Sequence, residues 1–248
     1  MEFVRIADIK RLNFIISALR DKLPEGAEVL DVGCGNGVIS RSLGEQGFKV
    51  KGIDISAKTI EKARSLNKFP NVTFDVISAE QLVADGHKYH GVICSEVLEH
   101  LSEPEKLLNI LHQTLHTDGI LIVTVPNGKG PRERFVTKPI VRLQKKNGWA
   151  WKTVKKIKGF FGYRGTTAQT SADDLTHIQF FTKPALEKLA DRNDFRIIQF
   201  GKTNFIEDVF PFSFVTKRVK TLQKLDCAIA EKLPYSFTGG FVTVWKKK

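Results

Sequence analysis

Three glycines at alternate positions are the residues of this chain most suited to holding a ligand against the backbone. They are Gly33, Gly35 and Gly37, and they follow an apolar run that contains Asp31. Glycine tolerates positive φ and has no Cβ, so the backbone of such a loop can approach a ligand closely. Residues 38–46 have helical periodicity, so the loop connects a predicted strand to a predicted helix. Such a loop at the carboxyl end of a strand in an α/β sheet is typical of a cofactor site.

A second acidic residue, Asp54, follows the glycine loop by about 20 residues, at the end of a strand predicted over residues 49–53. A carboxylate at this offset can accept hydrogen bonds from both hydroxyls of a ribose. Ser56 is suited to cap the helix predicted over residues 57–67. The pair of Asp54 and the glycine loop therefore predicts a site for a nucleoside.

The elements that would position these residues alternate along the chain. We predict further strands over residues 72–77, 91–94, 119–125, 196–203 and 241–245, and further helices over 7–22, 104–116 and 214–233. Residues 102–105 have the pattern of a capping box, with a proline in the first turn, and predict the start of the helix over 104–116. The alternation predicts a parallel sheet with right-handed crossovers.

Six segments occur in the order VLDVGCGNG, GIDIS, ISAEQL, ICSEVLEHL, VTVPN and HIQFFT. A dinucleotide fingerprint would have glycine at the position of Val38. The glycine loop of this chain, with Gly33, Gly35 and Gly37, instead resembles motif I of the class I methyltransferases that use S-adenosylmethionine. Residues 25–128 and 177–203 together resemble the broad group that includes the ubiquinone-biosynthesis O-methyltransferases. The resemblance implies an α/β fold with a Rossmann-like, mostly parallel sheet of seven strands, the last one antiparallel.

The resemblance also implies a cofactor and its contacts. Asp31 would orient the methionine end of S-adenosylmethionine, and Asp54 would hold its ribose. The predicted cofactor-binding residues are Asp31, Gly33, Cys34, Gly35, Gly37, Asp54, Ile55, Ala79, Glu80 and Ser95.

Two histidines are candidate bases. Methyl transfer from a sulfonium depends mainly on aligning the acceptor, and a hydroxyl acceptor must also lose its proton. His100 follows the fourth strand and His177 follows the segment after the fifth, and both have the pKa range of a base near neutral pH. The alternative roles are structural: His100 could orient its loop and His177 could bond to the backbone.

Glu96, Glu99 and His100 form the pattern E-x-x-E-H. On one helical turn these residues would share a face and could bind a divalent metal, with His177 as a fourth ligand. The ubiquinone O-methyltransferases and the small-RNA 3′-terminal 2′-O-methyltransferases resemble the chain here and use a metal. The alternative is that Glu99 bonds to the loop without a metal.

The positive charge is concentrated in one segment. The chain of 248 residues has a net charge of +12, and residues 129–168 hold 12 Lys or Arg against one Glu, which is +11. Trp149, Trp151, Phe160 and Phe161 interleave with these charges, which is typical of a basic amphipathic helix at an anionic membrane surface. Contact with nucleic acid and a plain lid over the site are the alternatives.

Together these observations predict a single methyltransferase domain over residues 1–248, with a basic aromatic insert over 129–176 and an amphipathic helical insertion over 204–240. Cys34, Cys94 and Cys227 show no paired or metal-binding spacing, and no apolar stretch is long enough to span a membrane. We expect a cytoplasmic protein with peripheral contact to the inner face of the membrane.

We expect an S-adenosylmethionine-dependent O-methyltransferase acting on a small or lipid-linked acceptor. The alternatives are an RNA 2′-O-methyltransferase that uses a divalent metal and a non-catalytic cofactor-binding protein. The oligomeric state is left open by the sequence.

Overall fold

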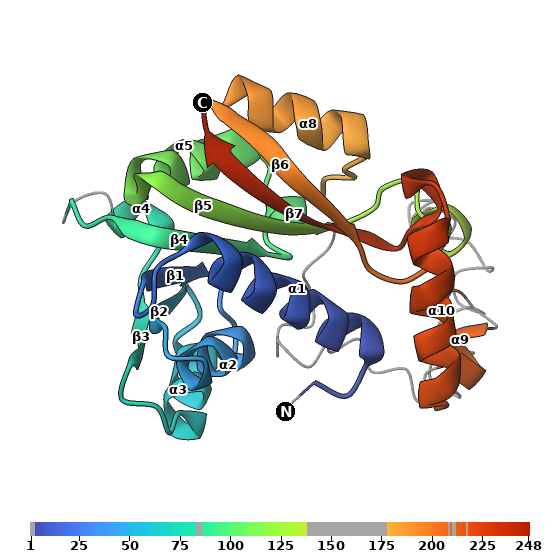
Figure 1. Cartoon of the computed structure of the whole chain (residues 1–248), viewed down its shortest axis with the longest axis horizontal. Helices are drawn as coiled ribbons and strands as arrows, with labels where there is room; N and C mark the ends of the chain where they lie inside the picture. Colours follow the sequence, from blue (N-terminus) through green and yellow to red (C-terminus); the bar gives the residue numbers. More distant parts are fainter. Residues whose placement is uncertain (1–2, 83–85, 138–177, 208, 210–211, 217) are drawn as a thin grey trace, which may run out of the picture.

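A single seven-stranded sheet organises the chain. The structure is a computed structural model, and it describes residues 3–82, 86–137, 178–207, 209, 212–216 and 218–248. The strands are β1 (Glu28–Val32), β2 (Lys49–Asp54), β3 (Val72–Val76), β4 (Tyr89–Ser95), β5 (Leu115–Pro126), β6 (Phe195–Lys202) and β7 (Gly240–Lys247). Their order is β3-β2-β1-β4-β5-β7-β6, with β1 to β5 parallel and β7 antiparallel to both of its neighbours (Figure 1). The predicted fold is confirmed.

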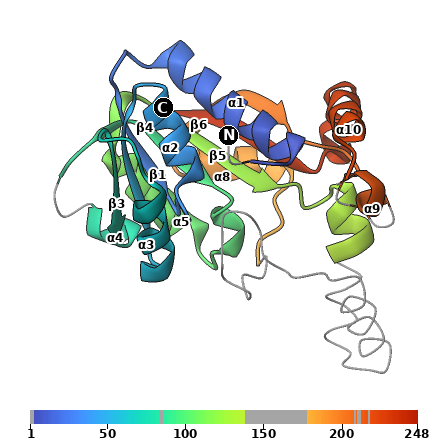
Figure 2. The ribbon, with the colours of Figure 1, turned by 90° about the horizontal axis from the view of Figure 1, so that it is seen from below.

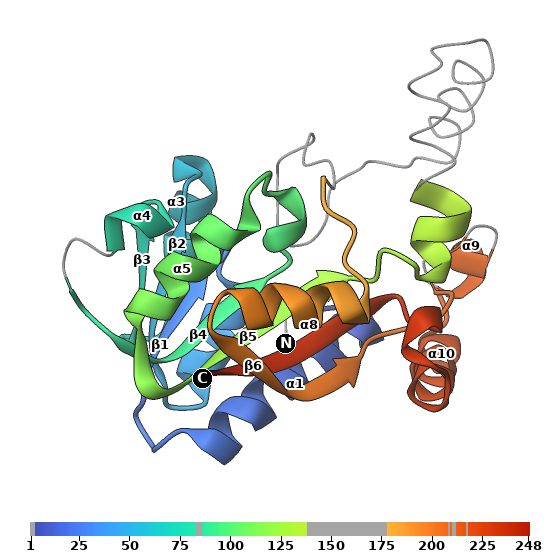
Figure 3. The same ribbon diagram turned by 90° about the horizontal axis from the view of Figure 1, so that it is seen from above.

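Helices cover both faces of the sheet (Figures 1 and 3). One layer holds α1 (Ile6–Lys22), α2 (Val38–Glu45) and α3 (Ala57–Leu66), and the other holds α4 (Ala79–Leu82), α5 (Pro104–Thr114) and α8 (Lys183–Arg192). Successive side chains of a strand point to opposite faces, so Val29 packs in the first layer and Leu30 in the second. Because both faces are buried, the inner strands are almost continuously apolar.

Local capping was predicted correctly at one helix and wrongly at another. The Ser56 hydroxyl accepts a 3.3 Å hydrogen bond from the amide of Thr59 at the start of α3, as predicted. The capping box at residues 102–105 is wrong, because α5 has Glu103 at its N-cap and no side-chain cap hydrogen bond. This helix also ends at Thr114 rather than at His116, which lies in β5.

The helix predicted over residues 214–233 is two helices, α9 (Phe212–Thr216) and α10 (Lys220–Lys232). The side chain of Gln223 donates a 3.1 Å hydrogen bond to the carbonyl of Thr216, the last residue of α9. The same side chain accepts a 2.9 Å hydrogen bond from the amide of Ile6, so it also ties α10 to the start of α1 (Figure 1). This long-range contact favours a break in the helix that local periodicity does not predict.

The outer edge of the sheet at β3 is covered by polar side chains of the preceding segment. Arg64 donates to the carbonyl of Phe74 from Nε at 2.9 Å and from Nη2 at 2.6 Å. Asn67 donates from Nδ2 to the carbonyl of Val72 at 2.8 Å. Two backbone acceptors of this edge strand are thereby satisfied within the chain.

Only the first part of the predicted basic insert is described. Residues 133–137 form η3 (Glu133–Thr137), one turn of π-helix, whereas residues 138–177 lie outside the described residues. The predictions made for Trp149, Trp151, Phe160, Phe161 and His177 therefore fall outside them. In the described parts of the chain no helix is long and apolar enough to cross a membrane. All three cysteines are buried and free.

Candidate functional site

The glycine loop joins β1 to α2 and lies directly against the end of β2. The amide of Gly35 donates a 3.1 Å hydrogen bond to Oδ2 of Asp54, and the amide of Cys34 donates to the carbonyl of Ile53 at 3.0 Å. Gly33, Gly35 and Gly37 have φ values of 67°, 56° and 77°, which are in the left-handed region that favours glycine. The sequence prediction that these two strand ends form one site is consistent with this geometry.

Asp54 and Ile55 present complementary surfaces beside the loop. The second oxygen of Asp54 accepts a 2.9 Å hydrogen bond from the amide of Ser56, so backbone amides hold the carboxylate at both oxygens. The side chain of Ile55 is 80% exposed, although it follows a buried strand. A fixed carboxylate next to an exposed apolar side chain fits the hydroxyls and the flat ring of a nucleoside. The residues present therefore fit the predicted cofactor.

Asp31 lies beneath the loop, with 1% of its surface exposed. Its Oδ2 accepts a 2.6 Å hydrogen bond from the hydroxyl of Ser40 in α2. Burial raises the pKa of Asp31 to about 7, the hydrogen bond from Ser40 opposes this rise, and the charge of Asp54 adds to it. In this arrangement Asp31 braces the first turn of α2 against β1.

The remaining predicted cofactor residues lie at strand ends. Cys34 is buried in the loop, and burial raises the pKa of its thiol, so this side chain is uncharged at neutral pH. Ala79 and Glu80 open α4 after β3, where a hydrogen bond from Ser78 lowers the pKa of the exposed Glu80. Ser95 ends β4 and is buried.

A chain of polar contacts runs from Ser95 to α1. The hydroxyl of Thr124 in β5 donates to Oε1 of Glu96 at 2.9 Å, so Ser95 is the donor in its own 2.9 Å hydrogen bond to Thr124. Nη1 of Arg11 lies 3.2 Å from the same oxygen of Glu96, and Nη2 of Arg11 donates to Asp8 at 3.0 Å. Sequence reasoning missed these contacts of Arg11 and Thr124, because both residues are far from Glu96 in the chain. Thr124 lies in the segment VTVPN, but that segment does not indicate its partner.

The pattern E-x-x-E-H does not lie on one helical turn, so the sequence prediction is wrong on this point. Glu96 has a φ of 58° and precedes the 3₁₀ turn η2 (Leu98–His100). Its carboxylate faces Thr124 and Arg11, whereas Glu99 is buried beneath the loop. Within the part of the chain that the structure describes, no group of three His, Cys, Asp or Glu is arranged to hold a metal ion. The predicted metal site therefore has no support in the described residues.

His100 and Glu99 remain neighbours at this loop. Nε2 of His100 lies 3.8 Å from Oε1 of Glu99, and the His100 side chain is 18% exposed. Burial raises the pKa of Glu99 well above its ordinary value, and the nearby charge of Glu96 adds to this rise, whereas Arg11 lowers it. The imidazole of His100 is therefore the accessible member of this pair and the candidate proton acceptor, whereas the carboxyl group of Glu99 is buried.

The segment after the insert returns to this loop. The amides of Ile178 and Gln179 donate to the carbonyl of Glu99 at 2.8 and 3.0 Å, and the amide of Gly128 donates to the carbonyl of Phe181. Residues 178–181 are thereby fixed between the ends of β4 and β5. The first described residues after the insert therefore lie next to the loop that contains His100. His177 directly precedes them in the sequence and lies outside the described residues.

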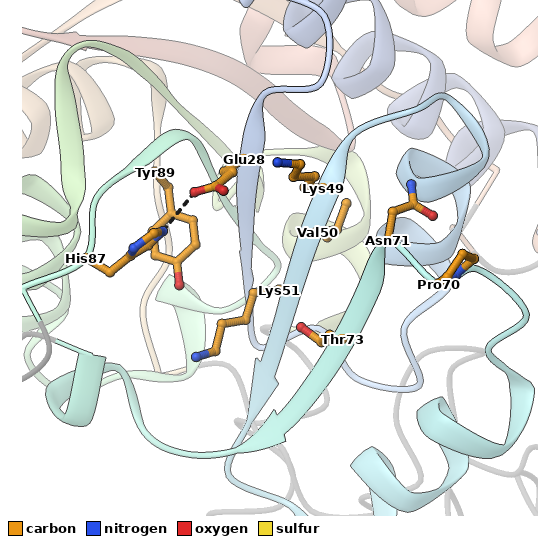
Figure 4. A pocket seen from close by; sticks show the side chains of 9 residues that line it. All are labelled: Glu28, Lys49, Val50, Lys51, Pro70, Asn71, Thr73, His87 and Tyr89. Carbon is orange, nitrogen blue, oxygen red and sulfur yellow. Dashed lines mark hydrogen bonds and ion pairs between the residues drawn. The ribbon is translucent and has the colours of Figure 1, made fainter.

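An open groove lies elsewhere on the described part of the chain. It has a volume of about 840 Å³ and is lined by residues at the amino ends of β1 to β4, including Glu28, Lys49, Lys51, His87 and Tyr89. Figure 4 shows these side chains, with the ion pair between His87 and Glu28 at one side of the groove. Ligands of open α/β sheets bind at the carboxyl ends of the strands, so the loop at Gly35 is the better candidate site.

Comparison with known proteins identifies the family of the chain. Residues 5–200 match the family described as methyltransferase domain. A ubiquinone biosynthesis O-methyltransferase of Neisseria meningitidis is 33% identical over 112 residues, which cover 43% of this chain and 47% of that protein. One of Xanthomonas axonopodis pv. citri is 34% identical over 120 residues, covering 47% of this chain and 49% of that protein. The chain thus spans about half the length of these curated relatives.

Solved structures show the same fold at low identity. The magnesium protoporphyrin IX methyltransferase of Synechocystis, solved with bound S-adenosylhomocysteine, has a TM-score of 0.57 at 20% identity and covers 98% of this chain and 84% of its own. A methyltransferase of Methanosarcina mazei has a TM-score of 0.59 at 18% identity, with 93% and 96% covered. With the family match over most of its length and this fold, the chain belongs to the methyltransferase-domain family of class I S-adenosylmethionine-dependent methyltransferases.

Proposed function

We propose that the chain binds S-adenosylmethionine at the carboxyl ends of β1, β2 and β4 and methylates an oxygen of a small or lipid-linked acceptor. The hydrogen bond from Gly35 to Asp54, beside the exposed Ile55, is the observation that carries the proposal for the cofactor. The acceptor class rests on relatives whose name is ubiquinone biosynthesis O-methyltransferase and which match less than half of the chain.

Each residue of the proposed site has a distinct task. Asp54 accepts the ribose hydroxyls, Ile55 packs against the adenine, and the glycine loop, which the buried Asp31 supports from beneath, orients the methionine end. When bound, the cofactor supplies an electrophilic methyl group at its sulfonium. His100 takes the proton of the acceptor hydroxyl, and the buried carboxyl group of Glu99 lies 3.8 Å from its Nε2. His177 is the second candidate for the same proton.

Two measurements on the full chain test this proposal. Calorimetry with S-adenosylhomocysteine should show binding at one site. Incubation with S-adenosylmethionine labelled in its methyl group and with fractionated cell extract should label a lipid or small-molecule fraction. Label in the RNA fraction would support the RNA 2′-O-methyltransferase instead. Binding without label in any fraction would support a non-catalytic protein.

We also propose that residues 129–168 contact an anionic membrane, so that a hydrophobic acceptor can enter the site from the lipid. The excess of eleven positive charges in this segment carries the proposal. Replacement of Lys152, Lys155, Lys156 and Lys158 by Gln should weaken sedimentation with phosphatidylglycerol vesicles and leave the affinity for S-adenosylhomocysteine unchanged. Wild-type protein that does not sediment at low salt would contradict the membrane contact and leave a plain lid.

A further inference from the structure

The outward side of α9 and α10 combines exposed apolar side chains with lysines. We call this the α9–α10 surface; it comprises Phe212, Val215, Val219, Lys220, Lys224, Leu225, Ile229 and Lys232. We infer that the α9–α10 surface docks on an anionic lipid membrane. The inference goes beyond the proposed function, because it concerns other residues and requires neither the cofactor nor the acceptor to be known.

The apolar residues of α10 are on the side that the protein core does not use. Gln223, Asp226, Cys227 and Ala230 are its buried residues, and they pack toward α1 and the segment after β6. Leu225 and Ile229 are four residues apart, so they lie one above the other on a different face. They are 55% and 40% exposed, and among the described residues no element covers them.

The acidic residues of α10 do not neutralise this surface. Asp226 is buried, and its two oxygens accept hydrogen bonds of 2.8 and 2.9 Å from the amides of Phe205 and Ile206. Glu231 forms an ion pair with Lys10 of α1. Lys220, Lys224 and Lys232 are exposed, and within the described part of the chain they form no ion pair. The outward side of α10 therefore carries uncompensated positive charge.

Apolar side chains flanked by lysines match the boundary between lipid headgroups and acyl chains. The apolar groups enter the boundary, and the ammonium groups remain with the anionic headgroups. The exposed residues of α9 extend this character, because Phe212 is 54% and Val215 is 53% exposed. Figures 2 and 3 show η3 beside α9, so a third element lies next to this surface.

The position of the surface suits docking. In Figure 1, α9 and α10 lie at one end of the molecule, whereas α3 lies at the other. A membrane at the α9–α10 end would therefore leave α3 in water. This provides a matched control on α3 and the residues directly after it, where Leu66 is 40% exposed and Lys58, Lys62 and Lys68 are exposed.

The experiment measures sedimentation of the full chain with vesicles of phosphatidylglycerol and phosphatidylcholine, and with vesicles of phosphatidylcholine alone. We expect binding to the anionic vesicles only. One lysine near an anionic surface strengthens binding roughly fivefold, so replacement of Lys220, Lys224 and Lys232 by Gln should weaken binding by about a hundredfold. The double replacement Leu225→Gln with Ile229→Gln should weaken it by roughly tenfold.

The α3 variants complete the test. Leu66→Gln, and the triple replacement of Lys58, Lys62 and Lys68 by Gln, should bind as the wild type does. Circular dichroism of every variant checks the fold, which these exposed positions should preserve. The inference is overturned if the α9–α10 variants bind as tightly as wild type, or if the α3 variants weaken binding equally.

Two further outcomes would overturn the inference in favour of a different segment or a different occupant. If only the lysines of residues 129–168 matter for sedimentation, the α9–α10 inference fails while the proposed membrane contact of that segment stands. If Leu225→Gln with Ile229→Gln instead converts an oligomer in solution to a monomer, the surface is covered by a second copy of the chain, and the inference is likewise overturned.

Discussion

The amide of Gly35 donates a 3.1 Å hydrogen bond to Oδ2 of Asp54, and this contact between residues 19 apart in the chain joins the loop after β1 to the end of β2. It fixes the position of the carboxylate before any ligand binds. The second oxygen is held by the amide of Ser56 in the same way. A carboxylate that is already oriented loses little conformational freedom when it accepts the hydroxyls of a ribose.

Replacement of Asp54 by Ala should therefore reduce cofactor affinity. Loss of a hydrogen-bonded charged group costs about 1.5–3 kcal/mol, so the Kd for S-adenosylhomocysteine should rise about 10- to 150-fold in calorimetry. Asp75→Ala is the control, because this carboxylate is 43% exposed and forms surface ion pairs with Lys51 and Arg64. Equal affinities of the Asp54 and Asp75 variants would refute the ribose assignment.

Any side chain at position 33 should lower the free energy of unfolding, for two separate reasons. The φ of Gly33 is 67°, and a Cβ would lie 2.6 Å from Cγ2 of Val97. Gly26 has a similar φ of 70° with open space around it. Both Gly→Ala variants carry the backbone cost of about 1–2 kcal/mol, and Gly33→Ala should lose roughly 1–3 kcal/mol more from overpacking.

Urea unfolding of the two Ala variants measures this difference. Adding Val97→Ala to Gly33→Ala should recover part of the steric loss, since the clashing methyl group is then absent. If Gly33→Ala and Gly26→Ala are equally stable, steric contact with Val97 does not explain the glycine at position 33.

The buried carboxyl group of Asp31 predicts a pH dependence. Its pKa is raised from 3.8 to about 7 in the folded protein. Between these values the folded state binds a proton that the unfolded state has lost, so the contribution of Asp31 to stability is present at low pH and is lost as the pH rises through about 7. The free energy of unfolding of the wild type should fall over this window relative to that of Asp31→Asn.

Urea titrations at several pH values test this expectation, and parallel stability profiles would contradict it. Ser40→Ala offers a second check. Because the Ser40 hydroxyl donates to the Asp31 carboxylate and lowers its pKa, removing that hydroxyl should move the pH window upward.

Asn127 should matter for stability although it lies beside the site. Its buried side chain donates to the carbonyls of Tyr235 and Thr238, both at 2.8 Å, and accepts from the amide of Lys129 at 3.1 Å. Asn127→Ala leaves these groups without a side-chain partner and should cost about 2–4 kcal/mol in urea unfolding. Asn13→Ala, at an exposed position of α1, should change stability by less than about 0.5 kcal/mol. A loss below about 1 kcal/mol for Asn127→Ala, the worth of one ordinary hydrogen bond, would contradict this account.

The features that the sequence predicted well depend on residues close together in the chain. The Ser56 cap is local, and the offset between Gly35 and Asp54 follows from a strand, helix and strand in succession. The alternation of strands and helices likewise identified the sheet. These features share one property: the interacting groups are brought together by a single supersecondary unit.

Apart from the local capping box at residues 102–105, which does not form, the features that were missed depend on contacts between distant parts of the chain. Glu96 was expected on a helical turn, but its backbone adopts a φ of 58° while its carboxylate faces Arg11 of α1 and Thr124 of β5. The division of α9 from α10 involves Gln223, which also binds the amide of Ile6. Periodicity within a window reports neither partner, because both contacts form only once the domain is assembled.

The side chains that cover the outer edge of β3 limit how copies of this protein can associate. An exposed strand edge offers a template for the backbone of another chain, which is one route to fibrous aggregates. Arg64 and Asn67 occupy the carbonyls of Phe74 and Val72. An incoming strand would have to displace these donors and would gain no net hydrogen bonds at those positions. Pairing of a second chain with this edge, which would be the first step of cross-β aggregation, is therefore disfavoured.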